Sequence, residues 1–262
     1  PAYTTDNYNE IVFTSTREGA TGKETDKWTA QNFSDLFVAK IDRKDEWSEP
    51  VLFDATEKLN TNANEGAAVF NSKFNTIYFT RCPNDQQKES GCQIYKARRT
   101  GRTWSEAEMV EMVGIDTLST IGQPTISEGE LVIYFAANRR NGLGGKDIWV
   151  AFRDSKSEPF GRPMNLGETI NTPGDEMFPF LRNDTTLFFA SDGHGGMGGL
   201  DIFVTKIDTS GNWGEPKNLK YPINSISDDF AIVFHPTDEY GFLSSSRKGS
   251  RGLEDIWYFI EP

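Results

Sequence analysis

The feature that most constrains this chain is a repeated unit of about 54 residues. A short apolar strand that follows a polar residue recurs five times, and its second residue is Leu36, Ile94, Ile148, Ile202 and Ile256 in turn. Successive copies are 58, 54, 54 and 54 residues apart. Because repeated units fold as stacked copies of one supersecondary structure, the repeat restricts the fold before any other feature does.

Three further segments give each unit four short strands. An aromatic run precedes the apolar triplet, as in IVFTST from Ile11 and LFFASD from Leu187. A segment such as Asn64–Phe70 opens the unit, and a segment such as Trp213–Pro216 closes it. Short runs rich in aromatic and β-branched residues, bounded by Gly and Asn, predict strands. The fold class is therefore predicted to be all-β, with four-stranded antiparallel sheets.

Five such units predict a five-bladed β-propeller. We expect one propeller domain over residues 1–262, with blades at approximately 1–57, 58–114, 115–168, 169–221 and 222–262. The terminal blades are expected to be incomplete within this chain, because Pro1–Thr4 falls inside an opening strand and no closing segment follows Asp255–Trp257. Flanking sequence would then complete them.

The charge of the chain restricts its partners. The sequence has 27 basic and 39 acidic residues, a net charge of −12. A phosphate backbone requires a basic surface, so we expect no nucleic acid partner. No apolar run approaches the roughly 18 residues that span a bilayer, so we expect no direct membrane insertion.

The units resemble the TolB-type, WD-repeat-like β-propeller repeat. The residues that carry the resemblance are NTPGDEMFPFL from Asn171, LFFASDGHGGMGGLDIF from Leu187 and WGEPKNL from Trp213. The forms GGKDIW and GGLDIF resemble the propeller domain of Bacteroidetes OmpA-family envelope proteins, PorE-like components of the type IX secretion system. In that family the propeller lies between an N-terminal TPR region and a C-terminal OmpA-like domain that binds peptidoglycan.

This resemblance implies a cellular location and a class of partner. The protein would be periplasmic and associated with the outer membrane. Its partners would be other cell-envelope or secretion-system proteins. Peptidoglycan would be bound only through a domain that is absent from this chain.

The two cysteines of the chain, Cys82 and Cys92, are predicted to form a disulfide. Cys82 ends an aromatic strand and Cys92 directly precedes an apolar triplet, so both lie at the mouth of one hairpin. Neighbouring strand positions have the short Cβ separation that a disulfide needs. A disulfide indicates an oxidising compartment such as the periplasm. The alternative is a pair of free thiols.

Four acidic residues follow Gly-rich hairpins and open the apolar triplets. They are Asp35, Asp147, Asp201 and Asp255. A carboxylate at this position can accept hydrogen bonds from the N–H groups of a tight turn, so we predict a structural role. A metal site needs several oxygen atoms around one ion, and we therefore predict neither a metal site nor a cofactor.

Five further carboxylates open the strands expected to be innermost. They are Glu65, Asp175, Glu176, Asp228 and Asp229. We expect them to gather near one mouth of the central channel as possible binding residues. A propeller glycoside hydrolase would use such carboxylates as an acid and as a base or nucleophile. Their common position in the repeat also explains them without catalysis.

The sequence predicts a non-catalytic scaffold for protein–protein interaction, with no catalytic residues. Its contact loops would be the segments that break the repeat, Gly19–Ser34, Pro83–Gly91 and Met109–Ile121. Two alternatives stay open. One is a five-bladed propeller glycoside hydrolase, and the other is a propeller that binds a small ligand or a cation through the channel-mouth carboxylates.

Overall fold

The computed structural model describes residues 1–21, 33–83, 91–115 and 118–261. The regular elements of this part of the chain are all strands. No helix able to cross a membrane is found in it. The predicted contact loop Pro83–Gly91 lies almost wholly outside the described residues, as do parts of Gly19–Ser34 and Met109–Ile121.

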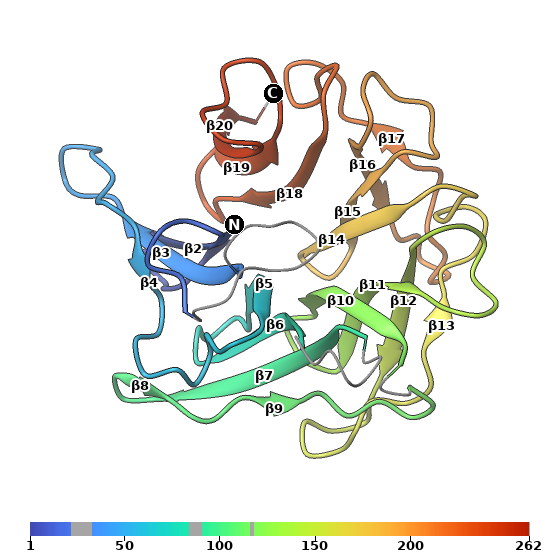
Figure 1. The fold of residues 1–262 in the computed structure, drawn as a ribbon. Coiled ribbons are helices and arrows are strands. Elements are labelled where there is room, and N and C mark those ends of the chain that lie inside the picture. Colours follow the sequence, from blue (N-terminus) through green and yellow to red (C-terminus); the bar gives the residue numbers. More distant parts are fainter. Residues whose placement is uncertain (22–32, 84–90, 116–117, 262) are drawn as a thin grey trace. The chain divides into compact units, whose positions relative to one another are not determined.

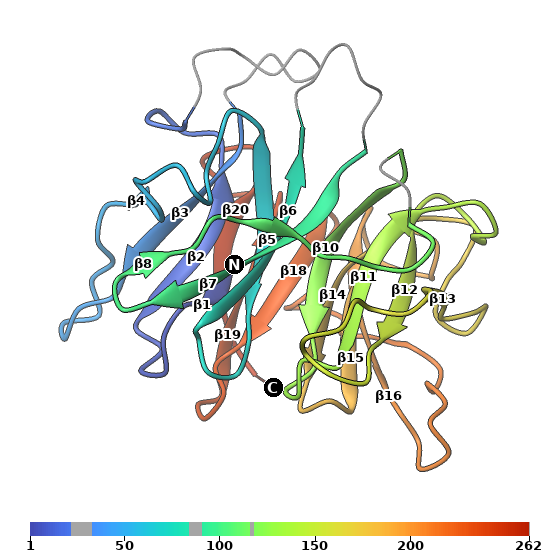
Figure 2. The ribbon, with the colours of Figure 1, turned by 90° about the horizontal axis from the view of Figure 1, so that it is seen from below.

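Five antiparallel sheets follow one another along the chain, one for each repeat, and the fold is a five-bladed β-propeller. The strands of each sheet lie side by side in chain order (Figures 1 and 2). The predicted fold class is therefore confirmed. The first sheet consists of β1 (Ala2–Tyr3), β2 (Glu10–Ser15), β3 (Asp35–Lys40) and β4 (Val51–Leu52). The second consists of β5 (Asn64–Phe70), β6 (Thr76–Cys82), β7 (Gln93–Thr100), β8 (Thr103–Trp104) and β9 (Glu108–Met109).

The other three sheets repeat the same order. The third consists of β10 (Thr120–Ile126), β11 (Val132–Asn138), β12 (Asp147–Phe152) and β13 (Met164–Asn165). The fourth consists of β14 (Glu176–Arg182), β15 (Thr186–Ser191), β16 (Asp201–Lys206) and β17 (Lys217–Asn218). The fifth consists of β18 (Asp229–Phe234), β19 (Tyr240–Ser245) and β20 (Asp255–Ile260).

The outermost strand varies most between the sheets. It is only two residues long in β4, β13 and β17. In the second sheet both β8 and β9 pair with β7, which gives five strands. In the fifth sheet the described residues form three strands.

The chain divides into two compact units. Ala2–Pro124 forms one of them, here called the N-terminal unit. Thr125–Pro262, with which Pro1 is grouped, forms the C-terminal unit. The N-terminal unit contains the first two sheets and the C-terminal unit the last two, while β10 of the third sheet crosses the division.

Apolar side chains from neighbouring sheets form the core of each unit. In the N-terminal unit, Leu36 of β3 and Phe79 of β6 are fully buried in one cluster. In the C-terminal unit, Ile148 of β12 and Phe189 of β15 belong to a second cluster, and Phe234 of β18 to a third. Burying one such side chain contributes about 1.5–3 kcal/mol relative to leaving it in water. The middle strands, such as β12 and β15, are buried along nearly their whole length, as expected for strands packed on both faces.

Three of the innermost strands contain a bulge that no sequence pattern predicts. The register shifts between Gly66 and Val69 in β5, between Met177 and Phe180 in β14, and between Phe230 and Val233 in β18. At each shift one residue other than glycine has a positive φ. These residues are Ala67 (φ 49°), Phe178 (φ 51°) and Ala231 (φ 51°). Side chains other than Gly or Asn adopt this conformation rarely, so tertiary contacts impose it.

Candidate functional site

At three junctions, neighbouring blades are joined by a six-residue motif, Asn-Ser/Thr-x-x-Asn/Asp-Glu/Asp. The last residue of this motif lies at the start of an innermost strand. We call the motif the clasp motif. Its three copies are Asn60–Glu65 at the first junction, Asn171–Glu176 at the third junction and Asn224–Asp229 at the fourth junction. These junctions join the first and second, third and fourth, and fourth and fifth sheets. All five carboxylates predicted for the channel mouth belong to these motifs.

The first residue of the clasp motif binds the backbone of the preceding blade. At the third junction, Ile148 N donates to Asn171 Oδ1 at 2.7 Å, and Asn171 Nδ2 donates to Ile148 O at 3.0 Å. A primary amide offers the same donor and acceptor as a peptide group, so the Asn171 side chain pairs with the backbone of Ile148 as a neighbouring strand residue would. The same two bonds join Asn60 to Leu36 and Asn224 to Ile202.

The fifth residue of the clasp motif binds the hairpin that precedes the apolar triplet. Lys146 N donates to Asp175 Oδ1 at 2.6 Å, and Leu200 N donates to Asp228 Oδ1 at 2.9 Å. Asp175 is half-buried and Asp228 is exposed. In the part of the chain that the structure describes, the Oδ2 atoms of these two residues accept no hydrogen bond.

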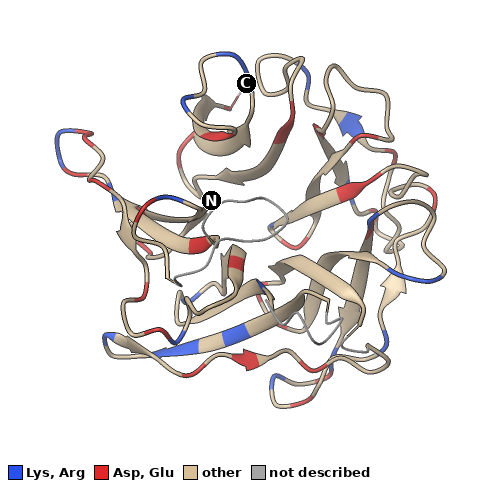
Figure 3. Cartoon of the chain, in the orientation of Figure 1, with Lys and Arg blue, Asp and Glu red and all other residues tan. Residues whose placement is uncertain are grey.

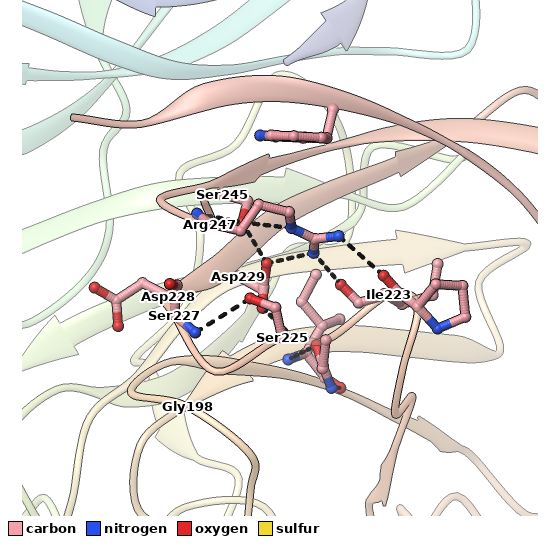
Figure 4. Close-up of polar contacts among 12 residues, drawn as sticks. Gly198, Ile223, Ser225, Ser227, Asp228, Asp229, Ser245 and Arg247 are labelled. Atoms are coloured by element: carbon pink, nitrogen blue, oxygen red, sulfur yellow. Dashed lines mark hydrogen bonds and ion pairs between the residues drawn. The ribbon is translucent and has the colours of Figure 1, made fainter. Parts of the chain in front are cut away.

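The sixth residue of the clasp motif is fully buried at all three junctions. Glu65, Glu176 and Asp229 each have 0% exposure. Glu176 accepts hydrogen bonds from Thr172 N and Oγ1 and from Ser191 Oγ. Asp229 accepts from Ser225 N and Ser245 Oγ and forms an ion pair with Arg247 Nη2 at 2.5 Å (Figure 4). In Figure 4 the neighbouring Asp228 carboxylate points away from this cluster.

Glu65 has the same kind of partners and an altered acidity. It accepts from Thr61 N and Oγ1 and forms an ion pair with Arg81 Nε at 2.8 Å. Burial raises the pKa of Glu65 to about 7, and the bonds from Thr61 and Arg81 oppose that shift. Burial also raises the pKa of Asp35, which lies within hydrogen-bonding reach of Glu65. A buried carboxyl group favours its neutral form because the charged form loses its hydration.

The four predicted hairpin acids accept N–H groups of the preceding turn through Oδ2. The donors are Thr21 N to Asp35, Leu143 N to Asp147, Met197 N to Asp201 and Arg251 N to Asp255. Their Oδ1 atoms differ from this pattern. These Oδ1 atoms are buried in Asp35, Asp147 and Asp201 and have no hydrogen-bond partner among the described residues.

The second junction, between β7 and β10, lacks the acidic residues of the clasp motif. Gln93 stands where the other blades have a hairpin acid, and Ile121 stands where Glu65 and Glu176 stand. This junction is instead fixed by backbone contacts beside a disulfide. Cys82 and Cys92 are joined with a Cα–Cα distance of 4.0 Å, which confirms the predicted pairing. Ile121 N donates to Cys92 O at 2.9 Å.

Two aromatic residues follow Asp175 and Asp228 closely in the chain. Phe178 of β14 and Phe230 of β18 have ring centroids 4.8 Å apart with an interplanar angle of 32°. Both side chains are partly exposed. Both residues lie at the bulges, which no sequence pattern predicted.

The structure divides the five predicted channel-mouth carboxylates into two classes. Glu65, Glu176 and Asp229 are buried and serve the junctions, whereas Asp175 and Asp228 reach solvent. Glu65 lies in the N-terminal unit and the other four lie in the C-terminal unit. Acidic residues are also spread over loops and strands in both units (Figure 3). Among the described residues, no three His, Cys, Asp or Glu side chains form a group suited to a metal ion.

Comparisons with known proteins identify the fold of the chain but assign it to no family. No family model and no curated protein matches the chain. Among solved structures, the chain is similar to the GH43 endo-arabinanase from Bacillus licheniformis, with 14% identity, a TM-score of 0.60, and coverage of 99% of this chain and 92% of that one. It is similar to Zg3597, a family 117 glycoside hydrolase from Zobellia galactanivorans, with 12% identity, a TM-score of 0.56, and 96% and 80% coverage.

A TolB-like protein is also among the similar structures. It is the putative TolB from Agrobacterium tumefaciens, with 12% identity, a TM-score of 0.51, and coverage of 87% of this chain and 73% of that one. At these identities the likeness shows the fold. The sequence resemblance to TolB-type repeats therefore agrees with the structure at the level of the propeller.

The comparisons correct the predicted function. Glycoside hydrolases recur among the similar structures, and they cover most of this chain. The prediction of a non-catalytic interaction scaffold was therefore wrong, as was the prediction that the chain is not an enzyme. That prediction relied on the repeat to explain all five carboxylates. The repeat explains why each blade has them, but it does not determine which of them stay open to solvent.

Proposed function

We propose that this chain is a carbohydrate-active propeller that hydrolyses a glycosidic bond at a surface of its C-terminal unit. We call this surface the acid–aromatic surface, and it comprises Asp175, Phe178, Asp228 and Phe230. One observation carries the proposal. Asp175 and Asp228 occupy equivalent positions of neighbouring blades, and both reach solvent. In each of them, only one carboxylate oxygen accepts a hydrogen bond from the described residues.

The chemistry of glycoside hydrolysis requires such a pair. One carboxyl group protonates the leaving oxygen, and the other activates water or attacks the sugar directly. Asp175 and Asp228 are held in place through Oδ1 by Lys146 N and Leu200 N. A carboxylate that is held through one oxygen and has the other available is suited to act as a positioned acid or base. Glu65, Glu176 and Asp229 do not, because all three are fully buried.

The aromatic rings supply the second part of the surface. Phe178 and Phe230 follow the two aspartates by three and two residues. A sugar ring has an apolar face of C–H groups, which packs against aromatic side chains. Two adjoining, partly exposed phenylalanine rings therefore suit a carbohydrate better than a highly charged ligand.

The similar structures support a glycan as the substrate class. An endo-arabinanase, a family 117 glycoside hydrolase and a β1,3-galactosidase share the propeller over most of this chain, with TM-scores of 0.60, 0.56 and 0.53. Their identities to this chain lie between 9% and 14%, so the support concerns the class of substrate and not a particular sugar.

A screen for hydrolysis tests the proposal. The purified chain is incubated with arabinan, galactan, agar-derived and pectic oligosaccharides, and released reducing ends are measured. We expect turnover of at least one substrate, and its loss in the double variant Asp175→Asn and Asp228→Asn. Thr209→Ala, at an exposed turn residue, is the control variant and should keep full activity. Binding without turnover would leave a glycan-binding surface and contradict the proposed reaction.

We also propose that the protein works in the periplasm, associated with the outer membrane and with other envelope proteins. The disulfide supports an oxidising compartment. The resemblance of the GGKDIW and GGLDIF segments to PorE-like, OmpA-family proteins supports the envelope. Fractionation of the producing cells tests this proposal. Recovery of the protein with the cytoplasmic fraction, with both cysteines reduced, would contradict it.

A further inference from the structure

The outer edge of β20 differs from the corresponding edge in the other four blades. In each of those blades, a short outermost segment pairs with the third long strand of the sheet. Among the described residues, the fifth sheet ends at β20, and no strand pairs with its outer edge. A strand edge presents a row of backbone N–H and C=O groups, to which a further strand can add.

Two backbone carbonyls of each third long strand accept hydrogen bonds from the outermost segment. One belongs to the second residue of the strand, and its bonds are Phe53 N to Leu36 O, Val110 N to Ile94 O, Leu166 N to Ile148 O and Leu219 N to Ile202 O. The other belongs to the sixth residue, and its bonds are Ser48 N to Lys40 O, Ser105 N to Arg98 O, Gly161 N to Phe152 O and Gly214 N to Lys206 O. The equivalent carbonyls of β20 belong to Ile256 and Ile260, and no outermost segment within the described ranges reaches them.

Two asparagine contacts are also missing at β20. At the three clasped junctions, an asparagine side chain binds both backbone groups of the second strand residue, but no described asparagine binds Ile256 in this way. In the third and fourth blades, an asparagine of the outermost strand donates to the hairpin acid. These bonds are Asn165 Nδ2 to Asp147 Oδ2 at 2.9 Å and Asn218 Nδ2 to Asp201 Oδ2 at 3.4 Å. Among the described residues, Asp255 accepts a hydrogen bond only from its own hairpin.

The side chains of β20 are apolar where those of the other blades are buried or charged. Tyr258 and Ile260 are 57% and 66% exposed, whereas Val150, which is equivalent to Tyr258, is 4% exposed. The equivalent strands β3 and β16 each end in an exposed lysine, but β20 carries no charge from Ile256 to Ile260. Charged side chains on an edge strand oppose pairing with another strand. The edge of β20 lacks this protection, so it suits an added strand.

We propose that the outer edge of β20 binds an extended segment of a partner protein, which adds to the fifth blade as its outermost strand. The chain's own blades define the chemistry of that segment. Pro163–Asn171 and Pro216–Asn224 share the pattern Pro-x-Asn-Leu-x-x-x-Ile-Asn. In the partner, the first asparagine donates to Asp255, the leucine N–H donates to Ile256 O, and the second asparagine binds both backbone groups of Ile256. The proposal is independent of the proposed hydrolysis.

A peptide titration tests this proposal. The probe is the fluorescently labelled peptide FGRPMNLGETIN, which has the sequence of residues 160–171, and its anisotropy is measured as the purified chain is added. We expect saturable binding. A control peptide with alanine in place of both asparagines should bind at least about tenfold more weakly, because it loses the hydrogen bonds to Asp255 and Ile256. An absence of saturable binding, or equal binding of the two peptides, overturns the proposal.

Hydrogen exchange locates the bound peptide. Saturating peptide should slow exchange at the Tyr258 amide by at least about tenfold, and leave exchange unchanged at the Val204 amide, because Val204 already pairs with Lys217. Protection elsewhere without protection of Tyr258 contradicts the proposal. Protection of Tyr258 before peptide is added, in this chain or in the protein isolated from its cells, shows that a second copy or flanking sequence covers the edge, and also contradicts it.

Two variants give a second test. Tyr258→Pro removes the N–H group from the edge and should abolish peptide binding, whereas Tyr258→Phe keeps this group and should bind the peptide as the wild type does. Equal binding by the two variants overturns the proposal. Should Tyr258→Pro fail to fold, the exchange of the Tyr258 amide in the wild type decides.

Discussion

Asn171 and Ile148 hold two blades together through a reciprocal pair of hydrogen bonds, although 23 residues separate them in the chain. Both backbone groups of Ile148 are satisfied by one side chain. Asn60 with Leu36 and Asn224 with Ile202 repeat the arrangement with separations of 24 and 22 residues. The stability of neighbouring blades therefore depends on single amide side chains as well as on apolar packing.

Asn171→Ala should destabilise the folded chain more than most substitutions of a polar residue. Asn171 is 2% exposed, and its removal leaves the N–H and C=O of Ile148 buried without this partner. We expect a loss of about 2–4 kcal/mol in the free energy of unfolding, measured in urea. The exposed control Thr209→Ala should lie within about 0.5 kcal/mol of the wild type. Equal values for the two variants would contradict the clasp.

Gly198→Ala should be severe, and Gly195→Ala should be mild, although both glycines lie in the same hairpin. A Cβ on Gly198 would lie 2.2 Å from Ser227 O, a backbone atom, whereas a Cβ on Gly195 meets nothing within 4 Å. We expect a loss of about 3 kcal/mol for Gly198→Ala, from the overpacking of a close backbone approach. Thermal unfolding of both variants checks this difference. Similar melting temperatures for the two variants would show that the hairpin is not in close contact with the clasp motif.

Glu65 should make the stability depend on pH. Its folded pKa is raised to about 7 from 4.5, so its contribution is fully present below pH 4.5 and is lost as the pH rises through 7. Glutamine imitates the neutral form. We expect the wild type to lose up to about 3 kcal/mol more than Glu65→Gln between pH 5 and pH 8. Urea unfolding at the two pH values measures the difference. Parallel profiles would show that Arg81 keeps Glu65 ionised throughout.

Removal of the disulfide should weaken the second junction selectively. Cys82→Ser with Cys92→Ser should lose about 2–3 kcal/mol, since the disulfide closes a loop of 11 residues, from 82 to 92. Hydrogen exchange should accelerate at the Ile121 amide, which donates to Cys92 O, more than at the Leu219 amide of the fourth sheet. Uniform acceleration at both amides would contradict a local effect.

The repeat made the architecture predictable. Local departures from the repeat, such as the bulges, could not be predicted from it. The apolar triplets around Leu36 and Ile148 place each third strand, because their spacing and composition recur in every unit. The positive φ of Phe178 has no sequence signal, since neither Gly nor Asn marks it. Only tertiary contacts impose that conformation, and it accompanies the ring contact with Phe230.

The sequence singled out the carboxylates of the clasp motifs but not their environments, and it did not single out Phe178 or Phe230. Asp228 and Asp229 are adjacent and chemically equivalent in the sequence. In the structure one is exposed and the other is 0% exposed beside Arg247. Adjacent strand residues face opposite sides, and the direction in which each faces depends on how the preceding hairpin docks. The clasp motif is a repeated Asn-Ser/Thr-x-x-Asn/Asp-Glu/Asp pattern in the sequence, but its function became clear only from the hydrogen bonds.

The most direct measurement for the central claim is the hydrolysis rate of single variants on whichever glycan the screen identifies. Asp175→Asn and Asp228→Asn should each lower kcat by about 10²–10⁴-fold, because each removes one of the two groups that transfer protons or attack the sugar. Circular dichroism and thermal unfolding should show that both variants remain folded. Glu215→Gln, at another exposed carboxylate of the same unit, should stay within about threefold of the wild type. Undiminished hydrolysis by both Asp175→Asn and Asp228→Asn would contradict the account.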